Sequence, residues 1–132
     1  MIKYGAYWTA RGVVYHQYLG LCLDEKSFQR NLKALKVAHP WPAWVSPAAN
    51  ATTHHMTRDD GEWLTMVCLR ENEKATPIDV ACLLVHEAVH VFQFFCDTIG
   101  EEAPSAELQA YGIQHIAQRL MEAYVELTQR ET

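Results

Sequence analysis

The sequence predicts an α+β domain in which a small β-sheet packs with three helices, in the order ββαββαα. Aromatic and β-branched residues concentrate in residues 2–22 and 50–70, as they do in strands. Residues 24–37, 77–99 and 106–130 carry the apolar periodicity or the continuous apolar content of helices. The chain has 132 residues, of which 49% are hydrophobic, so all of it fits one domain with one core. A chain of this length buries about two thirds of its unfolded surface and needs no metal merely to fold.

The N-terminal region predicts two strands followed by the first helix. Residues 2–22 contain a polar break at 10–12, which suggests a pair of strands around it. Asp24 is a good N-cap, because its carboxylate can accept a hydrogen bond from the backbone of the first turn. The helix that it begins has its apolar residues on one face: Phe28, Leu32 and Leu35.

Residues 50–70 predict a β-hairpin whose Asp-Gly pair at 60–61 supplies the tight turn. Alternate residues of its second strand lie on opposite faces: Trp63, Thr65, Val67 and Leu69 on one, and Leu64, Met66 and Cys68 on the other. This second strand, 62–70, is a candidate edge strand along which an extended peptide could pair through its backbone. His54 and His55 lie on the first strand, face opposite ways and are interpreted as surface side chains.

The longest apolar segment predicts a central helix that ends near Ile99. Thr76 is its N-cap, and Pro77 occupies the first position, where a missing N–H costs nothing. Gly100 supplies the stop. Because residues 80–96 are apolar on almost every face, we expect this helix to be buried on most sides.

A last helix is predicted over 106–130, with Ser105 as its N-cap. Its apolar stripe consists of Ile113, Ile116, Leu120, Tyr124 and Leu127. The link between the two helices is short, so a simple antiparallel hairpin would place residues 113–115 opposite His90.

Charge and cysteine content limit the classes of partner and compartment. Eleven Lys and Arg against sixteen Asp and Glu give a formal charge of −5, and no stretch gathers the basic residues into a patch, which argues against nucleic acid. No run of about 18 apolar residues occurs and the N-terminus is unlike a signal peptide, so we expect a cytoplasmic protein without a membrane partner. The cysteines lack CxxC spacing and are interpreted as reduced, buried thiols: Cys22, Cys68, Cys82 and Cys96.

The motif that carries chemistry is His86-Glu87-Ala88-Val89-His90, an HExxH sequence within the apolar helix. Two histidines four residues apart lie about 40° from each other around a helix, so both imidazoles can face one ion while Glu87 reaches a water on it. The competing interpretation is a pair of core histidines that bond to the backbone or to a carboxylate. Burying two histidines and a glutamate without an ion would be costly, which favours the metal.

This motif, preceded by a strand-rich segment and followed by a helix, resembles the zincin metallopeptidases. The resemblance implies that His86 and His90 bind Zn2+, that Glu87 is the general base, and that a third protein ligand completes the site. Glu107 is the favoured third ligand, because it follows His90 with sixteen residues between, near the gluzincin pattern. Gluzincins often carry an acidic residue four positions after that glutamate, where this chain has Tyr111.

Other third ligands stay open. His115 would lie closer to the HExxH histidines if the last two helices form a simple hairpin. In the extended pattern HExxHxxGxxH the last ligand position falls on Cys96, but Gln93 stands in place of the glycine that turns the chain. Glu101 and Glu102 lie in the link and are better interpreted as an acidic, solvated loop.

The zincin resemblance implies hydrolysis of a peptide bond by a zinc-activated water, whose proton Glu87 takes and passes to the leaving amine. Tyr111 or His115, one and two turns beyond Glu107, could stabilise the oxyanion. The chain is also similar to short HEAVH-containing proteins of bacteriophages and prophages, and its element order resembles that of small metallopeptidases that cleave phage repressors. A specific protein or peptide substrate is therefore implied. Two other classes stay open, a non-catalytic zinc-binding structural or interaction module and a metal-free interaction domain.

Overall fold

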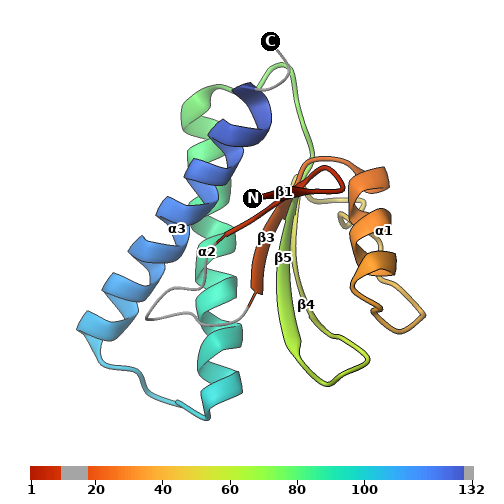
Figure 1. Cartoon of the computed structure of the whole chain (residues 1–132). Helices are drawn as coiled ribbons and strands as arrows, with labels where there is room; N and C mark the ends of the chain where they lie inside the picture. Colours follow the sequence, from red (N-terminus) through yellow and green to blue (C-terminus); the bar gives the residue numbers. More distant parts are fainter. Residues whose placement is uncertain (10–17, 130–132) are drawn as a thin grey trace.

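A computed structural model describes residues 1–9 and 18–129 and shows a layered domain (Figure 1). A five-stranded sheet lies between helix α1 on one face and helices α2 and α3 on the other. The predicted α+β class, with a small sheet and three helices, is confirmed. The elements are β1 (Ile2–Lys3), β2 (Ala6–Trp8), β3 (Tyr18–Cys22), α1 (Glu25–Ala34), β4 (Ala51–Thr57), β5 (Trp63–Leu69), α2 (Pro77–Ile99) and α3 (Ala106–Gln129).

The strand order is β1-β2-β3-β5-β4, which places β1 and β4 at the edges of the sheet that the described residues form. The predicted hairpin is confirmed as the antiparallel pair β4–β5. β5 also pairs in parallel with β3, with Leu21 opposite Val67. The expectation that 62–70 is an edge strand is therefore wrong, and β4 takes the edge. A hairpin signal determines only the local pairing, whereas the parallel pairing joins segments that are distant in the sequence.

The N-terminal region forms three strands where two were expected. A tight turn separates β1 from β2, and its Tyr4 and Gly5 have φ angles of 52° and 86°. Glycine adopts this left-handed conformation readily, whereas a tyrosine rarely does. A Cβ on Gly5 would also lie 2.1 Å from the hydroxyl oxygen of Ser27, so the turn needs glycine for space as well. The predicted polar break at 10–12 lies outside the described residues.

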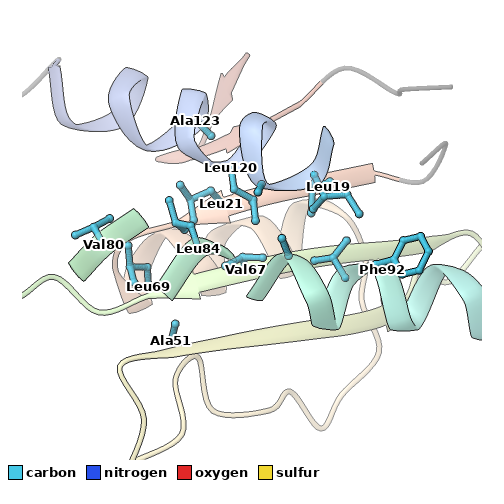
Figure 2. Close-up of a cluster of buried hydrophobic side chains, with 14 of the residues drawn as sticks. Leu19, Leu21, Ala51, Val67, Leu69, Val80, Leu84, Phe92, Leu120 and Ala123 are labelled. Atoms are coloured by element: carbon cyan, nitrogen blue, oxygen red, sulfur yellow. The ribbon is translucent and has the colours of Figure 1, made fainter. Parts of the chain in front are cut away.

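Two hydrophobic cores join the layers, one on each face of the sheet. In the core shown in Figure 2, Leu21 and Val67 of the sheet pack with Leu84 of α2 and Leu120 of α3. The core on the other face contains residues of α1, β3, β4 and β5: Cys22, Phe28, Leu32, Met56, Leu64, Met66 and Cys68. The alternation predicted for β5 is confirmed, because its odd-numbered apolar residues from Val67 on face α2 and α3 and its even-numbered ones face α1. β5 is therefore held from both sides.

The ends of the helices are set by the capping residues that the sequence indicated. The Asp24 carboxylate accepts a hydrogen bond of 2.7 Å from the backbone N–H of Ser27. Thr76 and Asp79 form a reciprocal capping box at the start of α2, with bonds of 2.9 and 3.1 Å. Gly100 ends α2 in the left-handed conformation, with φ of 73°. These local signals set where α2 begins and where it ends.

Helix α2 is less buried than the sequence predicted. One side lies in the core, but Cys82, Val85, His86 and His90 are exposed. The sheet and α3 cover only part of its circumference, which explains the difference. By length and apolar composition alone α2 could cross a membrane, and 39% of its most apolar window is buried. In the fold it packs on the sheet and on α3, an arrangement compatible with a small soluble domain.

Candidate functional site

His86 and His90 lie one turn apart on the exposed side of α2. Their ring centroids are 5.0 Å apart, and the rings meet edge to face at 71°. Both side chains are exposed, so the expectation that both histidines are buried is wrong. The Nδ1 atom of His90 lies 3.0 Å from Oε1 of Gln93, which leaves Nε2 of that ring outside this hydrogen bond. The pair is therefore accessible to an ion from solvent.

Glu87 turns toward the sheet instead. The residue is 4% exposed, and its Oε2 accepts a hydrogen bond of 2.5 Å from the hydroxyl of Thr53. Thr53 lies on the edge strand β4, opposite Val67 of β5. A hydroxyl that donates to a carboxylate makes a short, charge-assisted bond, which holds the carboxylate in one orientation. The motif thus places an anchored acid on the sheet side of α2 and two accessible imidazoles on its exposed side.

His55 links the edge strand to α2. Its ring stacks between Trp63 and Phe94, with centroid distances of 4.5 and 4.8 Å and nearly parallel planes. Its Nδ1 lies 2.8 Å from the hydroxyl oxygen of Thr65. Burial lowers the pKa of His55, although the nearby Asp97 carboxylate opposes the shift. This stack holds β4 against the second half of α2.

His54 faces the opposite side of the sheet. The residue is 8% exposed, its ring centroid lies 5.0 Å from that of Phe28, and its Nε2 lies 2.9 Å from the carbonyl oxygen of Trp44. Burial lowers the pKa of His54, against the effect of the hydrogen bond to Trp44. The prediction that His54 and His55 face opposite ways is confirmed. Their interpretation as surface side chains is wrong for His54, which is buried under α1, whereas His55 is half-buried.

A cavity of about 560 Å³ opens at the N-terminal half of α2. His86 and Glu87 lie on its wall, which continues to the ends of β4 and β5. Its lining also includes charged side chains of both signs, among them Arg70, Lys74 and Asp79. Small-molecule and side-chain pockets commonly have volumes of about 300–1,000 Å³, so this cavity is large enough to admit part of a substrate beside the motif.

The α3 residues that the sequence predicted for the site are exposed or half-buried. Glu107 is exposed, Tyr111 is 63% exposed and His115 is half-buried. Over residues 1–9 and 18–129, no group of three or more His, Cys, Asp or Glu side chains is placed to hold a metal ion. The structure thus brings His86 and His90 together and does not join Glu107 or His115 to them.

The remaining third-ligand alternatives lie near the end of α2. Cys96 is buried, and burial raises the pKa of its thiol, which disfavours the thiolate that a metal needs. Glu101 and Glu102 are exposed in the link, as expected of an acidic loop. Cys22, Cys68 and Cys96 are free and buried as predicted, whereas Cys82 is exposed, contrary to the prediction, and lines the cavity.

The sequence did not indicate two residues that hold the motif. Gln93 could have been found, because a position three residues after His90 lies on the same side of the helix. Thr53 could not, since its approach to Glu87 depends on the placement of β4 beside α2. Comparison of the chain with family models, with curated proteins and with solved structures gave no match. The site is therefore interpreted from its own geometry.

Proposed function

We propose that this protein is a zinc-dependent hydrolase, a metallopeptidase that acts on a specific protein or peptide. One observation carries the proposal: a buried, anchored carboxylate, Glu87, follows in the same helix turn the first of two accessible histidines, His86 and His90, which lie one helix turn apart. A fixed general base beside a pair of metal-binding imidazoles is what metal-assisted hydrolysis requires. His86 and Glu87 also share the wall of one cavity, where a substrate group could lie.

The donor chemistry of the histidine pair suits zinc, which neutral imidazole nitrogens bind well. His86 and His90 fit two ligand positions, because both rings are accessible and lie close together. Glu107, or His115 in its place, is proposed as the additional donor from α3. Bound zinc supplies two effects, a lowered pKa of its water and a polarised carbonyl group.

The residues of this chain would do the proton transfer. Glu87 takes a proton from the attacking water and delivers it to the leaving amine as the C–N bond breaks. Because the Thr53 hydroxyl occupies Oε2, the other carboxylate oxygen, Oε1, is the atom that exchanges the proton. Thr53 thereby keeps the base in one orientation through both transfers.

We propose that the substrate binds along the edge strand β4. It ends the sheet and carries Thr53, so its outer backbone is the edge nearest the motif. An extended peptide could add to this edge by main-chain hydrogen bonds. We further propose a regulatory or processing role on one protein, in the cytoplasm of a bacterium or of a phage-infected cell, as the resemblance of the HEAVH motif to short phage and prophage proteins implies.

The function is tested by zinc content and by cleavage of a proteome-derived peptide pool, with new termini counted by mass spectrometry. We expect one zinc per chain and cleavage by the wild-type protein. Glu87→Gln should retain zinc and lose cleavage, because it keeps the histidines and removes the base, whereas His86→Ala should lose both. Zinc well below one per chain in the wild type, or unchanged cleavage by Glu87→Gln, would refute the proposal.

The additional donor is decided by the zinc affinities of Glu107→Ala and His115→Ala. We expect the Glu107 variant to bind zinc more weakly and the His115 variant to bind it as the wild type does. The reverse result would assign the ligand to His115. Tyr111→Phe is the matched control on α3, because Tyr111 is exposed and its hydroxyl is proposed as an oxyanion donor and not as a ligand.

A non-catalytic zinc-binding interaction module is the second candidate. Exposed apolar residues on α2 favour it, since Ile78 in the first turn is 74% exposed and Val85, which precedes His86, is 41% exposed. The same two measurements separate the candidates. One zinc per chain without any cleavage by the wild-type protein would indicate the interaction module.

A further inference from the structure

We propose that Gln93 is a positioning residue that fixes the tautomer and the ring orientation of His90, so that Nε2 presents its lone pair to a metal ion. The inference deepens the proposed zinc site and rests on it for its role in metal binding. The hydrogen bond between the two side chains stands independently of any metal. It spans 3.0 Å from Nδ1 of His90 to Oε1 of Gln93.

The chemistry of this contact determines which ring nitrogen carries the proton. The amide oxygen Oε1 can only accept a hydrogen bond, so Nδ1 of His90 must donate. A neutral imidazole has one N–H, which leaves Nε2 unprotonated with a free lone pair. Only such a nitrogen can bind a metal, and an acceptor on the other nitrogen is how proteins select it.

The two motif histidines differ in this respect. Gln93 follows His90 by three residues, whereas the corresponding position after His86 is Val89, which has no polar group. Within the described part of the chain, no side chain or backbone group hydrogen-bonds the His86 ring, which meets the His90 ring edge to face instead. His90 is therefore the pre-oriented member of the pair. His86 serves as an internal control in any measurement on both rings.

Gln93 also stands where the extended HExxHxxG motif has its glycine. In this chain α2 continues through position 93 to Ile99, so the residue keeps helical geometry. The helix itself places the amide near His90, because residues three apart lie on the same side. In the extended motif the glycine at this position allows the chain to turn. In this chain Gln93 instead gives His90 a hydrogen-bond partner.

The tautomer is measured by 15N chemical shifts of the imidazole nitrogens at alkaline pH, where neutral rings predominate. In the metal-free wild type we expect His90 in the Nδ1–H form. In Gln93→Leu it should lose this preference, and in Gln93→Glu, which keeps an acceptor, it should regain it. His86 should not change. An Nε2–H form of His90 in the wild type, or the same tautomer in Gln93→Leu, would overturn the proposal.

Zinc affinity supplies the second readout. Loss of a hydrogen-bond partner of a metal-binding histidine typically weakens metal binding by about 10–100-fold, which we expect for Gln93→Leu, with recovery in Gln93→Glu. Gln93 is exposed, so the unfolding midpoint of the metal-free protein should be the same in all three proteins. Equal zinc affinity of Gln93→Leu and wild type would overturn the positioning role while the hydrolase proposal stands. If the wild type does not bind zinc, the hydrolase proposal is refuted. The tautomer measurement would still show whether Gln93 fixes the tautomer of His90.

Discussion

Replacing Thr53 by valine tests whether the edge strand anchors the buried acid. Valine keeps the β-branched shape that suits a strand and removes only the hydroxyl that donates to Glu87 at 2.5 Å. A hydrogen bond to a charged group contributes about 1.5–3 kcal/mol to stability, so Thr53→Val should lower the free energy of unfolding by that amount at neutral pH. With a urea m value of about 1–3 kcal/mol/M, the midpoint should fall by about 1 M.

A double-mutant cycle isolates the charge of Glu87 in this effect. In a Glu87→Gln background the acceptor is a neutral amide, for which a hydrogen bond contributes only about 0.5–1.5 kcal/mol. Thr53→Val should therefore cost about 1 kcal/mol less in that background than in the wild type. Thr57→Val is the matched control, because Thr57 is an exposed threonine of the same strand, and it should change stability by less than about 0.5 kcal/mol. If Thr53→Val lowers the free energy of unfolding equally in both backgrounds, the proposed anchoring of the Glu87 carboxylate is refuted.

Three further predictions concern a buried histidine, a close contact in the sheet and the cysteines. Because burial lowers the pKa of His54 in the folded state, the unfolded state takes up the proton first, so urea midpoints should fall as pH drops below about 6.5. His54→Gln should reduce this decline, and an identical decline in the variant would contradict the assignment. Gly20→Ala should destabilise the fold by about 1–3 kcal/mol, since a Cβ there would lie 2.8 Å from the ring of Trp8; calorimetry that finds no loss would contradict this. Under native conditions one thiol per chain, Cys82, should react with a maleimide, and all four should react after unfolding: Cys22, Cys68, Cys82 and Cys96. A Cys82→Ser protein that still reacts when folded would show that another cysteine is accessible.

The helix boundaries could be predicted because their determinants are local. Thr76, Pro77 and Gly100 act on groups within one turn of themselves, and the structure begins and ends α2 where they stand. The same holds for the β4–β5 hairpin, whose turn chemistry and alternation lie within twenty residues of sequence. Neither depends on where other elements pack.

The strand order and the burial of α2 could not be predicted, because they depend on contacts between distant segments. The pairing of Leu21 with Val67 decides that β4 and not β5 lies at the edge of the sheet that residues 1–9 and 18–129 form. The strand order also decides which side of α2 is covered. This apolar helix therefore retains an exposed face, which carries His86 and His90. The HExxH spacing indicated which residues could act together, and only the sheet order placed Thr53 beside them.

A metal ligand contributed by α3 would have a cost in free energy, because the helix would have to change its packing. Glu107 is exposed, and Ile116, nine residues later and thus about half a turn away around the helix, is fully packed in the core together with Leu120. Turning Glu107 toward His90 would expose both apolar side chains at a cost of about 3–6 kcal/mol in total. Structural zinc binding releases about 10–16 kcal/mol in favourable cases, which is enough to offset that cost. If Glu107 is the ligand, zinc must therefore change the packing of α3, and amide hydrogen exchange around Ile116 should differ between the metal-free and the zinc-loaded protein. Unchanged exchange in a protein that binds one zinc would place the additional donor outside α3.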